Sequence, residues 1–161
     1  MKILVCLLIL FPGFSIVAQK SSEETAVKNT IEAFFVAFHT QDSTALREFS
    51  HPSVTMQSVA EDEVGNVIIT TDTYSGFIKA ISAIPNTTKF EEVLHSFDIK
   101  VNGPLANAIT HYSFFVNREL SHCGVNSFQL VKLKENWKII YIVDTRSKEG
   151  CGDSVKFHIK N

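Results

Sequence analysis

The sequence predicts an α+β fold, in which three helices precede a long antiparallel meander of strands and one hairpin lies among the helices. Apolar residues recur at helical spacing between positions 27 and 38 and again between positions 77 and 84. From Phe90 onward the chain consists of four runs rich in β-branched and aromatic residues, separated by turn residues. Helices and strands that are segregated along the chain in this way are typical of an α+β fold.

The amino-terminal segment has the three parts of a cleavable signal peptide. Lys2 supplies the positive charge, residues 3–11 are apolar, and small and polar residues lead to Ala18. The apolar run is shorter than the roughly 20 residues that a bilayer anchor needs. The alternative is a buried first strand or helix. We expect residues 1–18 to be removed, and residues 19–161 to form a single domain that is secreted or periplasmic.

The helices are predicted from caps and apolar spacing. The first is expected to begin at a capping box formed by Ser21 and Glu24, and Asp42 or Ser43 is expected to cap a second, short one that ends at His51-Pro52. The third is expected over residues 74–84 and ends before Pro85. The inward faces of the first and third helices comprise Val27, Ile31, Phe34, Phe35 and Phe38, and Phe77, Ile78, Ile81 and Ile84.

The strands are predicted from alternation and turn residues. Residues 54–59 and 67–71 are expected to form a hairpin with Gly65 in its turn. Four longer strands are expected over residues 90–101, 105–118, 123–134 and 137–146, with turns at 102–104, 119–122 and 135–136.

This order of elements resembles the NTF2-like superfamily, in which a strongly curved, mainly antiparallel sheet wraps helices around a cavity. A more specific resemblance, to the exported bacterial lumazine-binding branch close to the SnoaL-like group, is carried by Tyr112-Ser113-Phe114, Ser121-His122-Cys123-Gly124, Phe128-Gln129-Leu130, Trp137-Lys138-Ile139 and Asp144-Thr145-Arg146. The resemblance covers residues 19–161 and implies the cone-shaped fold and its cavity.

Hairpin register predicts which side chains face that cavity. Turns centred on 103–104 and 135–136 place His95 opposite Tyr112, Phe97 opposite Thr110 and Val93 opposite Phe114, and Tyr141, Val143 and Thr145 opposite Leu130, Phe128 and Asn126. A longer turn at 119–122 places Tyr112 near Leu130 and Phe114 near Phe128. The predicted ligand-binding residues are His95, Phe97, Thr110, Tyr112, Phe114, Asn126, Phe128 and Tyr141, and the alternative is that they are ordinary core residues.

The opposite sheet face is expected to be unusually apolar. It carries Ile109, Phe115, Val131, Leu133, Ile140 and Ile142, with His111, Gln129, Asp144 and Arg146 among them. We interpret it as a homodimer surface, and the alternative is cover by residues 154–159. Asp144 and Arg146 are expected to form an ion pair with each other or across the interface, a structural role being favoured over a catalytic one.

The sequence excludes several kinds of chemistry. The formal net charge of -2 gives no reason to expect a nucleic-acid or membrane-surface partner. The six histidines lack metal-ligand spacing, and neither a nucleophile elbow nor a glycine-rich phosphate loop is present, so no metal and no cofactor are expected.

Two functions remain, together with a weaker third. The first is a non-catalytic domain that binds a small, partly apolar or aromatic molecule in the cavity. The alternative is a SnoaL-like enzyme performing proton-transfer chemistry of the isomerase, cyclase or hydrolase type, with His95 or His51 as the base and Tyr112 as a partner. Asp42 and Asp98 are further candidates, although Asp98 points away from the cavity face. The third is a dimeric interaction module with a filled cavity.

A disulfide between Cys123 and Cys151 is predicted from the last hairpin. Its register places Cys123 opposite position 148, three residues before Cys151, and Gly150 and Gly152 allow the chain to turn back. Export would supply the oxidising environment. The alternative is a reactive thiol at Cys123, next to His122.

Overall fold

The computed structural model describes residues 15–152, with side chains described from Ser21 onward. Ten elements follow one another along the chain: α1 (Ser15–His39), α2 (Ser43–Phe49), β1 (Ser50–Glu61), β2 (Val67–Thr73), α3 (Tyr74–Ser82), β3 (Phe90–Leu94), β4 (Asp98–Asn102), β5 (Leu105–Val116), β6 (Glu119–Leu133) and β7 (Asn136–Thr145). Most of the predicted signal peptide, residues 1–14, lies outside the described residues. No helix in the described part of the chain is long and apolar enough to cross a membrane.

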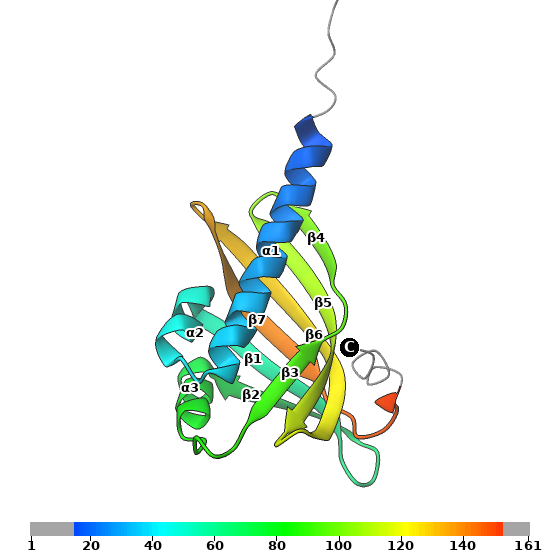
Figure 1. Cartoon of the computed structure of the whole chain (residues 1–161). Helices are drawn as coiled ribbons and strands as arrows, with labels where there is room; N and C mark the ends of the chain where they lie inside the picture. The colour runs from blue at the N-terminus through cyan, green and yellow to red at the C-terminus, as the bar shows by residue number, and fades with distance from the viewer. Residues whose placement is uncertain (1–14, 153–161) are drawn as a thin grey trace, which may run out of the picture.

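The strands form one curved sheet in the order β2-β1-β7-β6-β5-β3, with β4 also paired to β5. All pairs are antiparallel except β1 with β7. Figure 1 shows α1 lying across the concave face of this sheet, with α2 and α3 gathered near β1 and β2. The predicted α+β fold of three helices packed on a strongly curved, mainly antiparallel sheet is confirmed.

The helix α1 begins earlier than the capping box predicts. It starts at Ser15, so Ser21 and Glu24 lie inside the helix. The residues from Ser15 to Lys20 include no glycine or proline, and nothing therefore stops the helix from extending upstream. Glu23 joins α1 to the sheet by accepting hydrogen bonds from Lys132 Nζ at 2.6 Å and Trp137 Nε1 at 3.0 Å.

The other local predictions are confirmed in type, although β1 is longer than the predicted 54–59 and includes His51 and Pro52, which were expected to end α2. Asp42 caps α2, its Oδ1 accepting from the backbone N–H groups of Thr44 and Ala45 at 3.0 Å. The β1–β2 hairpin has Gly65 at φ 84° in its turn. The helix α3 ends at Ser82, two residues earlier than predicted.

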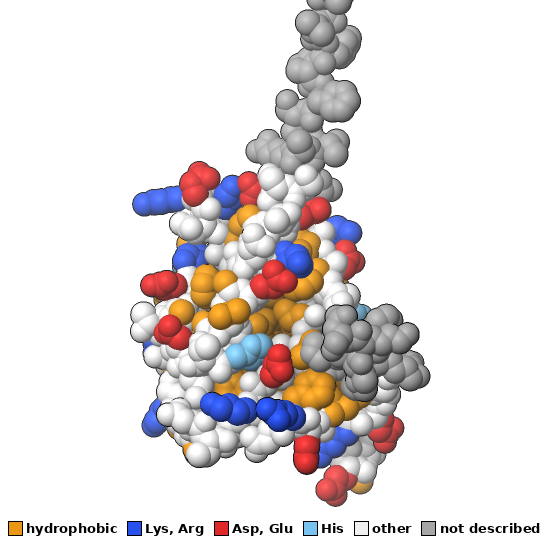
Figure 2. Space-filling view, viewed as in Figure 1, with side chains coloured by type: hydrophobic (Ala, Val, Ile, Leu, Met, Phe, Trp, Pro, Cys, Tyr) orange, Lys and Arg blue, Asp and Glu red, His pale blue; other side chains and the backbone are white. Residues whose placement is uncertain are grey.

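The core lies between α1 and the concave face of the sheet. The predicted face of α1 is buried, and its Phe35 ring packs edge-on against Phe128 with centroids 6.2 Å apart. Ala106 and Ala108 of β5 are fully buried, and their small side chains leave room for the phenylalanines of the core. Hydrophobic side chains also reach the surface along both sides of α1 (Figure 2).

The predicted strand over residues 90–101 is divided at His95, and its two parts have different registers. In β4, Asp98 pairs with Ile109 as the turn at 103–104 predicts. In β3, Leu94 pairs with Tyr112, and the predicted positions of His95 opposite Tyr112 and Val93 opposite Phe114 are wrong. This one-residue shift places Glu92 opposite Phe114, on the concave face.

The β5–β6 hairpin turns earlier than predicted. Its turn residues are Asn117 and Arg118, both with positive φ, as a two-residue turn of this kind requires. Tyr112 therefore pairs with Gly124 and not with Leu130, and Phe114 pairs with His122 and not with Phe128. Because the shift from position 130 to position 124 is an even number of residues, Tyr112 and Phe114 stay on their predicted face.

A bulge at Ile140 changes the face of the last strand. Leu130 pairs with Ile139 but Gln129 pairs with Tyr141, so one residue of β7 is extra. The predicted pairs of Tyr141, Val143 and Thr145 with Leu130, Phe128 and Asn126 are wrong. Ile142 and Asp144 pair with Phe128 and Asn126 in their place.

Because of this bulge, the outer face of the sheet also differs from the predicted one. Ile142 is buried, and Asp144 and Arg146 line a cavity on the concave side. Ile109 and Leu133 remain on the outer side, each 44% exposed. Dimerisation through this face stays a prediction.

The predicted disulfide between Cys123 and Cys151 is confirmed, with Cα atoms 5.6 Å apart. Cys123 pairs with Ser147 through two backbone hydrogen bonds of 2.9 Å, one residue away from the predicted position 148. The disulfide therefore fastens the segment after β7 to the first third of β6.

Candidate functional site

A cavity of about 280 Å³ lies between α1, α3 and the concave face of the sheet. Its lining comprises Phe34, Phe35, Phe38, Met56, Phe77, Ile81, Glu92, Tyr112, Phe114, His122, Asn126, Phe128, Ile142, Asp144 and Arg146. The helices contribute only apolar side chains. All the charged and amide groups come from β3, β6 and the end of β7.

The apolar wall is built from stacked phenylalanines. Phe34 and Phe38, four residues apart on α1, both stack against Phe77 of α3, with Phe38 and Phe77 centroids 5.9 Å apart and ring planes within 12°. Phe38 also packs edge-on against Phe90 at 5.0 Å. Aromatic contacts of this kind make the helical wall of the cavity rigid.

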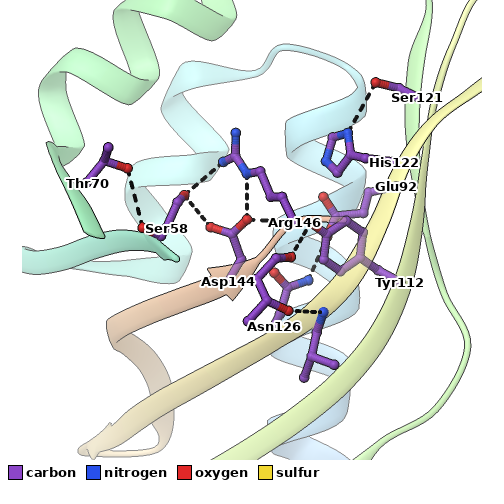
Figure 3. A network of polar contacts seen from close by, with 11 residues as sticks. Ser58, Thr70, Glu92, Tyr112, Ser121, His122, Asn126, Asp144 and Arg146 are labelled. Atoms are coloured by element: carbon purple, nitrogen blue, oxygen red, sulfur yellow. Dashed lines mark hydrogen bonds and ion pairs between the residues drawn. The ribbon is translucent and has the colours of Figure 1, made fainter. Parts of the chain in front are cut away.

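Glu92 is the central polar group. Asn126 Nδ2 donates a hydrogen bond to Glu92 Oε1 at 2.6 Å, while the backbone N–H of Glu92 donates to His39 Nε2 at 2.8 Å. Figure 3 shows the side chains of Glu92, Asn126 and Tyr112 close together. Burial raises the pKa of Glu92 to about 7 and the charge of Asp144 adds to the rise, although Asn126 and Arg146 oppose it.

Asp144 and Arg146 form the second part of the polar end. Arg146 Nε donates to Asp144 Oδ2 at 2.6 Å, which confirms the predicted ion pair and shows that it forms within one chain. Ser58 Oγ donates to Asp144 Oδ1 at 2.5 Å and accepts from the Arg146 guanidinium at 3.0 Å (Figure 3). The pair is therefore held in place from β1.

The hydroxyl group of Tyr112 is held in place by a hydrogen bond that it donates. Its hydroxyl donates to the carbonyl oxygen of Thr145 at 2.9 Å and lies 3.4 Å from Asp144 Oδ2. Burial, followed by the charge of Asp144, raises the pKa of Tyr112 far above its usual range. Tyr112 thus stays neutral and offers a ring to the cavity.

His122 lies over the aromatic side chains of β5. Its ring stacks on Phe114 with centroids 4.9 Å apart and meets Tyr112 edge-on at 5.7 Å. Burial and then the charge of Arg146 lower the pKa of His122, so the imidazole is neutral at pH 7.

The predicted ligand-binding residues fall into two groups. Tyr112, Phe114, Asn126 and Phe128 line the cavity. Thr110 is fully buried outside the lining, and its hydroxyl has no hydrogen-bond partner within the described part of the chain. His95, Phe97 and Tyr141 do not line the cavity.

Each of these three side chains has contacts elsewhere. His95 Nε2 lies 2.9 Å from Ser113 Oγ, on the face opposite to Tyr112. The Nζ atom of Lys28 lies over the ring of Phe97, 5.3 Å from the ring centroid. The Tyr141 hydroxyl donates to Gln57.

The other predicted bases also lie away from the cavity. His51 Nδ1 is 2.7 Å from Ser53 Oγ at the start of β1, Asp42 caps α2, and Asp98 pairs with Lys100 on the surface. The residues that sequence reasoning missed as site residues are Glu92, His122, Asp144 and Arg146. Among the described residues, no three metal-ligating side chains lie together.

Gly124 allows the close packing behind Tyr112. A Cβ atom at this position would lie 1.8 Å from the carbonyl oxygen of Thr145 and 3.0 Å from Tyr112 Cε1. We expect Gly124→Ala to lower the free energy of unfolding by about 2 kcal/mol, because the backbone at Thr145 must move. Urea unfolding measures this, with Gly152→Ala as the control, since a Cβ there would meet no atom of the described residues within 4 Å. Equal stability of the two variants would contradict the prediction.

Comparison with known proteins gives the class of fold. No family model and no curated protein matches the sequence. A protein of unknown function from Mycobacterium tuberculosis superposes with a TM-score of 0.68 at 12% identity, covering 92% of this chain and 86% of that one. A proposed dehydratase of the NTF2-like family from Streptomyces avermitilis has a TM-score of 0.61 at 13% identity, covering 79% and 97%.

A third similar structure is the beta subunit of a proposed aromatic-ring-hydroxylating dioxygenase from Novosphingobium aromaticivorans. Its TM-score is 0.65 at 13% identity, and the match covers 82% of this chain and 92% of that one. The chain therefore has the NTF2-like fold, as its element order predicts. The narrower resemblance to the lumazine-binding and SnoaL-like branch stays a prediction. Since a shared fold does not define a function, the function has to be inferred from the site.

Proposed function

We propose that this protein binds a small, partly apolar or aromatic molecule in the cavity between α1, α3 and the sheet. The observation that carries the proposal is the division of the cavity into a wall of phenylalanines and one polar end. A volume of about 280 Å³ is just below the usual range for small-molecule sites. An apolar cavity with a few convergent polar groups is the usual form of such a site.

The lining suggests how the ligand is oriented. Its apolar part would pack against the cluster of contacting rings that includes Phe38, Phe77 and Phe114. Its polar part would face Glu92 and Asn126.

Glu92 favours a second candidate function, proton-transfer catalysis. A carboxylate with a pKa of about 7 can both accept and donate a proton at neutral pH. In such an enzyme Glu92 would be the base, and His95 and His51 would have no part in the chemistry, because neither lines the cavity. The Tyr112 hydroxyl would orient the end of β7 through Thr145.

Recovery of small molecules from the purified protein tests the proposal. We expect mass spectrometry to detect the same compounds in wild type and in Val64→Trp, whose position is 82% exposed. We expect their loss from Ile81→Trp, because the larger ring would fill the cavity from α3. Thermal unfolding would show that both variants are folded.

Retention of the compounds by folded Ile81→Trp would contradict binding in this cavity. The two candidate functions are separated by incubating the recovered compound with fresh protein. Conversion by wild type and its loss in Glu92→Gln would favour catalysis, whereas unchanged compound would favour binding.

A further inference from the structure

Glu92 is a carboxylate without a cation. Besides the neutral Tyr112, four ionisable side chains line the cavity: Glu92, Asp144, Arg146 and His122. Asp144 and Arg146 neutralise each other at 2.6 Å, and His122 is neutral. Glu92 forms no ion pair with any residue in the described part of the chain, and Asn126, its hydrogen-bond partner, is uncharged.

The lining around this carboxylate is rich in aromatic rings. Phe34, Phe38, Phe77 and Phe114 bring their rings to the cavity. The faces of aromatic rings attract cations, and the attraction is strongest where water is excluded. A partly buried carboxylate and several aromatic rings around one space therefore complement a positive charge on a flat apolar body.

An anion is less well matched. Arg146 is the only cationic side chain among the described residues of the lining, and it already donates to Asp144 and Ser58. An anionic group in contact with Arg146 would also lie near the negative charges of Asp144 and Glu92. Its removal from water would then be opposed by repulsion from both carboxylates.

We propose that the ligand of this cavity is an organic cation, an aromatic or apolar body that bears a protonated amidine or amine, with Glu92 as its counter-ion. This inference rests on the proposed function and names the class of molecule that the same site selects. A ligand of this kind would pair with Glu92 while Asn126 holds the carboxylate in place. The hydrogen bond from Asn126 leaves the second carboxylate oxygen for the cation.

The groups around Glu92 define the pH dependence. Asp144 and Arg146 face it from the end of β7, Tyr112 from β5, His122 from β6 and His39 from α1. Burial lowers the pKa values of His39 and His122 and raises that of Tyr112, whereas the pKa of Glu92 is about 7. Affinity for the cation should therefore rise as the pH increases through about 7.

Three isosteric probes test the inference: benzamidine is a cation, benzamide is neutral and benzoate is an anion. Titrations followed by NMR at pH 8 should show that benzamidine binds about tenfold more tightly than benzamide, with benzoate the weakest. Glu92→Gln should remove this preference. Glu91→Gln makes the same change in charge at an exposed neighbouring position and should retain it.

Other outcomes would overturn the inference. Equal binding of benzamide and benzamidine, tighter binding of benzoate, or an unchanged preference in Glu92→Gln would each show that Glu92 does not select a cation. Absence of binding by all three probes at millimolar concentration would also overturn it. The co-purification experiment judges the proposed function separately, because it depends on the volume of the cavity and not on the charge of its ligand.

Discussion

Replacing Cys151 with serine is expected to lower the free energy of unfolding by about 3.5 kcal/mol. The disulfide joins residues 28 positions apart, so breaking it restores considerable freedom to the unfolded chain. In the folded protein the disulfide fastens the segment after β7 to β6, next to His122 and Gly124. Urea unfolding of wild type and variant measures the loss.

Reduction provides the matched control for this prediction. Dithiothreitol should destabilise wild type by the same amount and leave Cys151→Ser unchanged, and Cys123→Ser should match Cys151→Ser. Two free thiols in unreduced wild-type protein, or equal stability of wild type and variant, would contradict the prediction.

Fold class could be predicted because it depends on patterns that many residues repeat. The apolar spacing of α1 and the cap at Asp42 are local signals, and the structure contains both features. The strand ends and turns were predicted less accurately. In the turn between β5 and β6, for example, Asn117 and Arg118 adopt positive φ although neither is a glycine. The turn at these residues thus gave no strong signal.

The faces of the strands depend on single residues. The predicted register between β5 and β6 was wrong by six positions. Because this is an even number, Tyr112 and Phe114 still lie on the cavity side of the sheet. The bulge at Ile140 and the break at His95 are shifts of one residue. Each exchanged the two faces of a strand, and neither is marked by a glycine or proline.

These two shifts also explain which site residues were missed. The bulge brings Asp144 and Arg146 into the cavity and turns Tyr141 out of it. The break in the strand at His95 brings Glu92 into the cavity lining and leaves His95 outside it. One signal could have found Glu92, because strand alternation places it on the same face as Phe90 and Leu94.

Glu92→Gln is expected to stabilise the protein at pH 8 by about 3 kcal/mol. A folded-state pKa of about 7, against the ordinary 4.5, means that ionised Glu92 costs stability of this size. Below pH 4.5 the side chain is protonated in both states, so the two proteins should be equally stable there. The advantage of the variant should grow as the pH rises from about 4.5 and level off above about 7.

The measurement is urea unfolding of wild type, Glu92→Gln and the exposed control Glu91→Gln at several pH values. Glutamine keeps an oxygen that can accept from Asn126, so the comparison isolates the charge. Equal gains in both variants would show a general effect of net charge, and a loss in Glu92→Gln would show that the carboxylate is already compensated. A gain confined to Glu92→Gln would mean that the protein keeps a destabilising charge in its cavity. Such a cost is typical of functional sites, and a bound cation that neutralised Glu92 would remove it.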